Sequence, residues 1–309
     1  MSITTITLNP SIDQSFSVAR VIAERKLLGE NLRLDPGGGG INVARVVSRL
    51  GGETRAWWSA GGENGRHLAQ LLDRESVPHT AVPIAGEVRQ NLVIRDRSTG
   101  EQYRFGLEGP TLSELELQDW CRCIREQSAA YVVFSGSLPG ATSAAEFKRL
   151  LGAVPRGAQL IVDTKQEALR AALEFGVYLI KPNHHELEQL VERELCDDQQ
   201  LVEAAREIIG RGGARVVVVS LGRGGALYIT ADHGERLIAP AVPIRSKVGA
   251  GDSMVGGITY ALQQGRSLSE AVRLGIAAGS ATVMNEGTEL CRREDVERLS
   301  PKVVGQALP

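Results

Sequence analysis

The amino-acid sequence predicts an α/β fold in which helices cover both faces of a mostly parallel sheet. Short runs of β-branched residues alternate with longer segments whose apolar residues recur at helical spacing. Several of the predicted strands are apolar throughout, as expected for strands that are buried on both sides. The chain also has 35 glycines among 309 residues, above the usual share of about 7%, and they gather where backbone must come close to something.

The predicted elements follow one another along the chain. Strands are expected at residues 3–8, 55–60, 131–135, 160–163, 178–181 and 215–221. Helices are expected at residues 41–50, 65–75, 113–126, 143–151, 166–175, 185–191, 199–210, 253–264, 267–285 and 293–299.

Two segments interrupt this alternation. Residues 14–35 have no helical period, and residues 88–107 predict a β-hairpin around a turn at residues 97–101. A few extra strands cannot form a second core on their own. We therefore expect one domain over residues 1–309, in which segments 14–35 and 88–107 form a lid over the active face.

Composition excludes several classes of protein. Lys and Arg total 35 against 37 Asp and Glu, so the basic excess of a charge-driven nucleic-acid-binding protein is absent. No apolar run approaches the ~18 residues of a membrane span, and residues 1–13 lack the pattern of a secretory signal. The four cysteines form no C-x-x-C pair. We expect a cytoplasmic protein with reduced cysteines that binds neither nucleic acid nor membranes.

The glycine groups do not match the common dinucleotide or P-loop signatures. Neither residues 37–42 nor residues 249–254 complete G-x-G-x-x-G, and the dipeptide Gly-Lys is absent. This disfavours a NAD-linked dehydrogenase. Residues 184–186, His-His-Glu, have the wrong spacing for a zinc-binding helix, so we expect no metal held by His or Cys.

The segment 248–253 places glycines directly before a helix rich in small residues. The backbone N–H groups of Gly249, Ala250 and Gly251 would be free there and would point at one spot, with the positive end of the helix dipole behind them. Such a pocket suits a phosphoryl group in transfer, and Asp252 could accept the proton of an attacking hydroxyl. Asp252 could equally well cap the helix, so the motif alone leaves both interpretations open.

A second group, residues 37–40, consists of four consecutive glycines at the start of the first long helix. Such a run is unfavourable unless a ligand lies against the backbone. Asn42 offers a donor and an acceptor for sugar hydroxyls, and Asp13 offers a carboxylate. Taken singly, residues of these types are more often ordinary turn or capping residues.

Together these motifs resemble the ribokinase-like (PfkB) carbohydrate kinase family. Residues 38–44 are similar to its amino-terminal G-G-x-x-x-N-x-A segment, one residue tighter, and residues 249–252 match its G-A-G-D segment. Further likeness lies in residues 7–13, 135–139, 181–186 and 220–225, so the resemblance spans essentially the whole chain. It implies a three-layer α/β/α fold with a small β-lid.

Within the family, the sequence is most similar to the branch that phosphorylates fructose 6-phosphate. Residues 36–45, 89–92, 100–105 and 248–256 carry this likeness. The branches that act on fructose 1-phosphate or tagatose 6-phosphate typically carry a lysine where Gly39 or Gly40 stands.

The resemblance also implies roles for individual residues. Asp252 would be the catalytic base, and Gly249, Ala250 and Gly251 would form the anion hole. The sugar phosphate would be bound by Asp13, Lys26, Gly38, Gly39, Asn42, Arg89, Arg104 and Ser137. ATP would be bound by Lys181, Asn183, Ser220, Gly222, Gly225, Ser280 and Asn285.

Two metal ions are implied as well. Mg²⁺ would be placed by Asn183 and Glu186, largely through water, although Glu186 alone would be interpreted as an exposed helix carboxylate. K⁺ would be bound near the anion hole by Ser246 and Val248, but Lys247 stands where a small hydroxyl residue is common. Glu108, which departs from the usual sequence after the lid, is expected to face solvent.

The resulting hypothesis is an ATP- and Mg²⁺-dependent kinase that converts fructose 6-phosphate to fructose 1,6-bisphosphate. A homodimer through the lid is expected, so that one of the lid cations could serve the neighbour's site. A tagatose-6-phosphate kinase or a 1-phosphofructokinase would use the same chemistry. A catalytically silent sugar-phosphate sensor on the same scaffold is the non-enzyme alternative, and the intact Asp252 argues against it.

Overall fold

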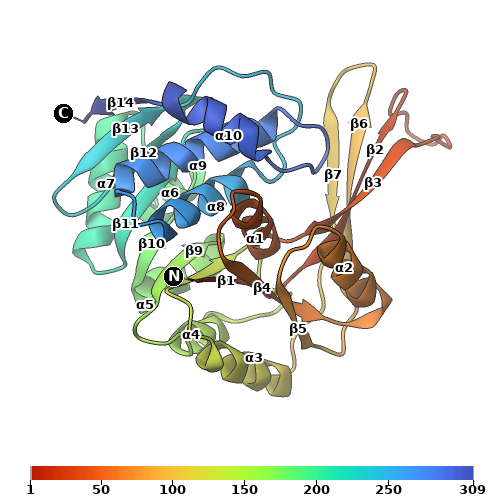
Figure 1. Ribbon diagram of the computed structural model, residues 1–309, viewed down its shortest axis with the longest axis horizontal. Coiled ribbons are helices and arrows are strands. Elements are labelled where there is room, and N and C mark those ends of the chain that lie inside the picture. Colours follow the sequence, from red (N-terminus) through yellow and green to blue (C-terminus); the bar gives the residue numbers. More distant parts are fainter. Residues whose placement is uncertain (1, 309) are drawn as a thin grey trace.

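The computed structural model describes residues 2–308, which form two β-sheets and ten α-helices (Figure 1). The large sheet has ten strands in the order β14 (Val304–Ala307), β13 (Gly234–Ile238), β12 (Ala226–Ile229), β11 (Ala214–Ser220), β10 (Val177–Ile180), β9 (Gln159–Asp163), β8 (Tyr131–Ser135), β1 (Ile3–Thr7), β4 (Thr54–Ala60) and β5 (His79–Pro83). Neighbouring strands from β11 to β5 are parallel, whereas β12, β13 and β14 are antiparallel additions at one edge.

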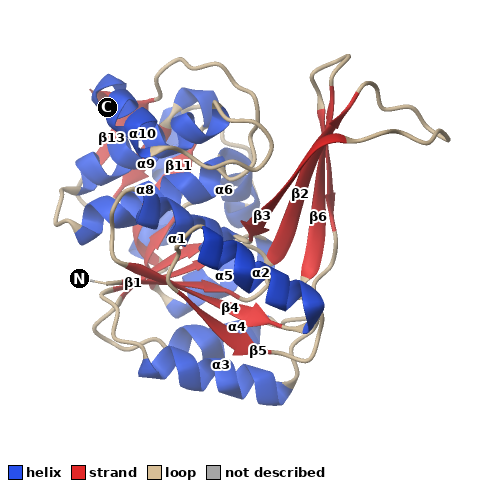
Figure 2. Ribbon diagram, turned by 45° about the vertical axis from the view of Figure 1, so that its right-hand side comes forward, coloured by secondary structure: helices blue, strands red, loops and turns tan. Residues whose placement is uncertain are grey.

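Helices cover both faces of this sheet (Figures 1 and 2). One face carries α1 (Gly39–Arg49), α2 (Gly62–Arg74), α8 (Ala250–Gln263), α9 (Leu268–Val283) and α10 (Arg293–Leu299). The other carries α3 (Glu114–Glu126), α4 (Ala144–Gly152), α5 (Gln166–Phe175), α6 (His184–Val191) and α7 (Asp198–Gly210). Along β8, Val132 and Phe134 pack toward the second set and Val133 toward the first. Burial on both faces explains the uniformly apolar strands and confirms the predicted three-layer fold.

The predicted strands and helices are found with ends shifted by a few residues, but four strands of the large sheet were not predicted. These are β5, β12, β13 and β14. Each is only four or five residues long, and together they lie at the two edges of the sheet, where apolar patterning is weak. β5 also ends in Pro83, a residue that edge strands tolerate.

A separate four-stranded sheet projects from the body (Figure 2). We call it the small sheet; its order is β3 (Glu30–Gly37), β2 (Ser11–Val18), β6 (Arg89–Asp96) and β7 (Gln102–Gly106). β2 and β6 are parallel, while β3 and β7 are antiparallel to them. Because side chains alternate along a strand, one face of the small sheet carries Asp13 and Asn91, which lie directly opposite each other.

Candidate active site

The start of α8 is built by glycine. Gly249 occupies the N-cap position with φ +72°, a left-handed conformation, and no side chain caps the helix. A Cβ at Gly249 would also lie 2.5 Å from the Leu290 side chain. Since Asp252 is the third residue of α8 and makes no capping bond, its interpretation as a helix cap is wrong. The first N–H groups of α8 are therefore open to an anion.

Asp252 lies in a partly buried position where α8 meets α1. Its Oδ2 accepts a hydrogen bond of 2.8 Å from Asn42 Nδ2. Burial and the Asp163 carboxylate, with a smaller effect of Asp13, raise the pKa of Asp252 to about 6, against the lowering effects of Asn42 and Lys181. A carboxylate with a pKa close to neutral pH is well suited to accept a proton during catalysis.

Lys181 and Asp163 lie beside this carboxylate at the carboxyl ends of two neighbouring parallel strands. Lys181 Nζ is 3.2 Å from Asp163 Oδ1, and only 6% of Lys181 is exposed. Burial by itself lowers the pKa of Lys181, but Asp163, Glu186 and Asp252 raise it above the ordinary value. A Cβ on Gly251 would be 3.5 Å from Lys181 Nζ, so the ammonium group faces the start of α8. Asp163 was missed from the sequence, although its position at a strand end could have indicated it.

Asp13 lies at the base of the small sheet and is buried. Its Oδ1 accepts hydrogen bonds from Asn91 Nδ2 at 2.9 Å and from Ser11 Oγ at 2.7 Å. Burial raises the pKa of Asp13, although Ser11, Asn91 and the charge of Arg89 oppose this. The charge of Asp13 contributes to the raised pKa of Asp252, so the two carboxylates lie within electrostatic range of each other.

The glycine run 37–40 is required by close packing within the protein itself. A Cβ at Gly38 would lie 2.6 Å from Thr7 Cγ2, one at Gly39 2.5 Å from Gly136 N, and one at Gly40 2.5 Å from Thr7 Oγ1. A Cβ at Gly37 would collide with the Asp13 carboxylate. The run is therefore explained by close packing of the α1 start against the ends of β1, β2 and β8, and a ligand is not needed to account for it.

Arg89 is the predicted phosphate contact that lies near Asp13. Its Nη1 donates to Leu107 O at 2.9 Å and its Nη2 to Asn9 O at 3.3 Å, while Nε is buried without a partner among residues 2–308. The Asn9 side chain in turn donates to Ser137 Oγ at 3.1 Å. Asn9 thus joins Arg89 and Ser137, a link that the sequence did not reveal.

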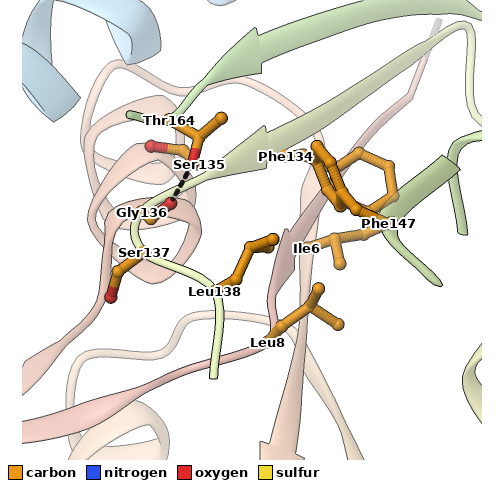
Figure 3. A pocket seen from close by; sticks show the side chains of 9 residues that line it. All are labelled: Ile6, Leu8, Phe134, Ser135, Gly136, Ser137, Leu138, Phe147 and Thr164. Carbon is orange, nitrogen blue, oxygen red and sulfur yellow. Dashed lines mark hydrogen bonds between the residues drawn. The ribbon is translucent and has the colours of Figure 1, made fainter. Parts of the chain in front are cut away.

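Ser137 follows β8, next to a small cavity of about 10 Å³ (Figure 3). Figure 3 shows the apolar side chains of Ile6, Phe134 and Phe147 gathered on one side of it, with the Ser137 hydroxyl directed away from them. Thr164 Oγ1 donates to Gly136 O at 2.9 Å and holds the turn. This volume is about that of one water molecule, so the cavity is not the substrate site.

The other two predicted phosphate contacts also belong to the lid segments. Lys26 is exposed in the loop between β2 and β3. Arg104 pairs in register with Val93 and is exposed on the face of the small sheet that carries Asn91. Glu108 is exposed, as expected.

Four of the seven predicted ATP residues lie near the end of β11. Asn183 forms an isolated bridge with Ser220, and Gly222 and Gly225 shape the following turn with φ +57° and +89°. Asn183 and Glu186 form a capping box on α6, in which Asn183 N donates to Glu186 Oε2 at 2.8 Å. Glu186 is thus more than an exposed carboxylate, because it orders the turn that carries Asn183.

Ser280 is buried on α9, and Asn285 lies beyond its end, where Nδ2 donates to Leu290 O at 3.1 Å. Ser246 is buried; its Oγ donates to Gly287 O at 2.6 Å and accepts from Val248 N at 3.2 Å. Lys247 is exposed, so its ammonium group can remain in water.

The layered α/β body and the uncapped start of α8 beside a partly buried carboxylate are those of a small-molecule kinase, which transfers a phosphoryl group to a hydroxyl. Residues 6–295 match the family described as pfkB family carbohydrate kinase. The chain belongs to this family.

Known proteins of the family are similar over nearly the whole chain. The sequence is 43% identical over 298 residues to the ATP-dependent 6-phosphofructokinase isozyme 2 of Escherichia coli (strain K12), with 96% of each chain covered. It is 30% identical to the 1-phosphofructokinase of Bacillus subtilis (strain 168), with 97% of each covered. The crystal structure of E. coli phosphofructokinase-2 in complex with substrates and products superposes with a TM-score of 0.93 at 42% identity, covering 98% of this chain and 99% of that one. No helix among residues 2–308 is long and apolar enough to span a membrane.

Proposed function

We propose that the protein is an ATP-dependent 6-phosphofructokinase, which converts fructose 6-phosphate and ATP to fructose 1,6-bisphosphate and ADP. The observation that carries the proposal is the position of Asp252, which is partly buried beside the open start of α8 and accepts a hydrogen bond from Asn42. Of the two phosphofructokinases compared above, the 6-phosphofructokinase of E. coli is more similar to this chain (43% identical) than the 1-phosphofructokinase of B. subtilis (30% identical).

In the proposed reaction, the primary hydroxyl of the sugar attacks the γ-phosphorus of ATP. A new O–P bond forms, the P–O bond to ADP breaks, and the hydroxyl proton passes to Asp252. The N–H groups of Gly249, Ala250 and Gly251 and the ammonium group of Lys181 stabilise the negative charge that develops on the phosphoryl oxygens.

Arg89 and Ser137 would hold the phosphate already on the sugar. The unpaired donor of Arg89 supports this role, because a phosphate oxygen would supply the missing acceptor. Asp13 and Asn42, with Gly38 and Gly39 of the adjoining turn, would bind the sugar hydroxyls, while Ser220, Gly222, Gly225, Ser280 and Asn285 would line the nucleotide side.

The residues present fit the expected ions. Among residues 2–308, no group of three or more His, Cys, Asp or Glu is arranged so that it could hold a metal ion by itself. Mg²⁺ in kinases is bound mainly by water and phosphates with one or two carboxylates. Glu186 and Asn183 would meet such an ion through water, and Mg²⁺ would neutralise the ATP phosphates. Ser246 and the Val248 and Gly287 backbone supply oxygens suited to K⁺. The E. coli enzyme has a crystal structure in complex with potassium.

The glycines that distinguish the branches support fructose 6-phosphate as the substrate. A lysine at Gly39 would place its Cβ against Ser135 Oγ and 2.5 Å from Gly136 N, and one at Gly40 would lie 2.5 Å from Thr7 Oγ1. The lysine of the other branches therefore needs a different turn from the one in this protein.

We further propose that the small sheet joins two protomers and closes the site as a lid. Phe105 is directly opposite Leu92, and Tyr103 opposite Ile94, on the face turned away from Asp13. Phe105 is 50% exposed and Leu32, from β3, 63%, and exposed apolar faces of this kind mark interfaces. Lys26 would then serve the neighbour's site. The E. coli enzyme also has a tetrameric inhibited form. For the present protein, a cytoplasmic location remains a prediction.

Coupled ADP release with fructose 6-phosphate, fructose 1-phosphate and tagatose 6-phosphate tests the proposal. The highest kcat/KM is expected for fructose 6-phosphate, and a clear preference for either other sugar would overturn the substrate. Asp252→Asn should abolish turnover while ATP binding, measured by calorimetry, persists. Turnover close to that of the unaltered enzyme would exclude Asp252 as the base, and no turnover by the unaltered protein with any of the three sugars would favour the sensor.

A further inference from the structure

Arg45 is a fully buried cation on α1, with 1% of its surface exposed. A buried arginine is unfavourable unless carboxylates and acceptors surround it. Its Nε donates to Glu75 Oε2 at 2.9 Å, its Nη2 pairs with the other oxygen of Glu75, and Asp35 lies 3.5 Å from Nη2. Glu75, at the end of α2, thus anchors the guanidinium through Nε and Nη2.

The remaining nitrogen of Arg45 points toward the active site. Nη1 donates to Asn42 Oδ1 at 3.1 Å and to Pro36 O at 2.9 Å, just before the glycine run. A guanidinium has donors only, so the Asn42 atom that faces it must be the oxygen. The NH₂ group of Asn42 is thereby directed to the opposite side, where it donates to Asp252 Oδ2 at 2.8 Å.

We propose that Arg45 is a positioning residue for the catalytic base: it holds the Asn42 amide in the one orientation that donates to Asp252, and Glu75 anchors it. The inference rests on the proposed role of Asp252. Without Arg45, the amide can turn over and present its oxygen to Asp252. Two oxygens can share a hydrogen bond only when the carboxyl group carries a proton, and a protonated Asp252 cannot act as a base.

The other groups around Asp252 make this orientation matter. Burial, Asp163 from the end of β9 and Asp13 from β2 raise its pKa, whereas Lys181 after β10 and the Asn42 hydrogen bond lower it. The pKa already stands at about 6. Loss of the hydrogen bond from Asn42 would therefore raise the pKa of Asp252 further, toward neutral pH.

The test is the pH dependence of kcat/KM for fructose 6-phosphate at saturating MgATP in Arg45→Met. The acid limb is expected to move up by about one to two pH units, so that kcat/KM on that limb falls roughly 10- to 100-fold. The phosphate of the sugar also titrates near pH 6. The shift is therefore taken as the difference between variants on the same substrate. A purely structural role would raise KM or lower the melting temperature without moving the limb.

Arg49→Met is the matched control. Arg49 pairs with the same Glu75 at 3.0 Å, but its other contacts are the Leu290 and Cys291 carbonyls rather than Asn42. Its acid limb should not move. Glu75→Gln loosens the anchor without altering Arg45 and should move the limb in the same direction by a smaller amount.

The outcomes separate the inference from the proposed function. An acid limb that does not move in Arg45→Met would overturn the inference. If Arg45→Met does not fold, an unmoved limb in Glu75→Gln would overturn it instead. In either case an inactive Asp252→Asn would leave Asp252 as the base. An equal shift in Arg49→Met would also overturn it. An active Asp252→Asn would remove the proposed base and this inference together.

Discussion

Arg89→Ala provides the sharpest test of how the sugar phosphate is recognised. The guanidinium is partly buried, and burial lowers its pKa, with the charge of Asp13 acting in the opposite direction. Its Nε donor lacks a partner among residues 2–308. A phosphate bound there would form one or two charge-assisted hydrogen bonds, each worth about 1.5–3 kcal/mol. One such bond corresponds to roughly a 10- to 150-fold rise in KM.

The assay is coupled ADP release. Fructose 6-phosphate is varied at saturating MgATP, and MgATP is then varied at saturating fructose 6-phosphate. KM for the sugar phosphate should rise by that factor, whereas KM for ATP should change little. Arg97→Ala is the matched control, because Arg97 lies in the same hairpin, is 46% exposed and pairs with Glu30 at 2.8 Å. Equal increases in both KM values, or an equal effect of Arg97→Ala, would refute the argument.

Three further predictions concern stability, potassium and assembly. The pKa of Asp252 is raised in the folded protein, so protonation of this carboxyl group favours the folded state below its ordinary pKa of 3.8. This stabilisation disappears as pH rises through about 6. Asp252→Asn should therefore melt at a higher temperature than the unaltered protein at pH 8 but not at pH 3.5; equal melting at pH 8 would contradict this. K⁺ in place of Na⁺ at equal ionic strength should raise kcat, and Ser246→Ala should remove that difference; no response of the unaltered enzyme would argue against the site. Phe105→Asp should reduce the sedimenting mass by breaking the contact through the small sheet, whereas Leu115→Asp on α3, 73% exposed, should not; unchanged mass in both would exclude that contact.

Much of the body could be predicted because its signals are local. The apolar strands record burial on both faces, and the helices record one buried stripe each. The same locality explains what was missed. The short edge strands β12, β13 and β14 have little pattern of their own and exist because a neighbouring strand offers hydrogen bonds.

The glycine groups include one that the sequence rightly associated with a helix start and one whose cause it could not show. The sequence predicted a helix beginning at Ser253, just after the glycines of residues 249–251, and the helix begins three residues earlier, at Ala250. It could not show that Gly37–Gly40 pack against β1, β2 and β8, because the atoms that exclude a Cβ there belong to Thr7, Asp13, Ser135 and Gly136. Close approach of backbone leaves the same trace in a sequence whether the neighbour is a ligand or the protein itself.

The sequence by itself determined the layered fold, the family resemblance and the positions of Asp252 and Asn42, since these follow from periodicity and short motifs. Only the tertiary structure decided that Asn42 donates to Asp252 across 210 positions of chain, and that Arg45 is held by Glu75. The orientation of a side chain and the pKa of a buried carboxylate depend on the groups that packing brings within a few ångströms. Spacing along the chain does not encode that distance.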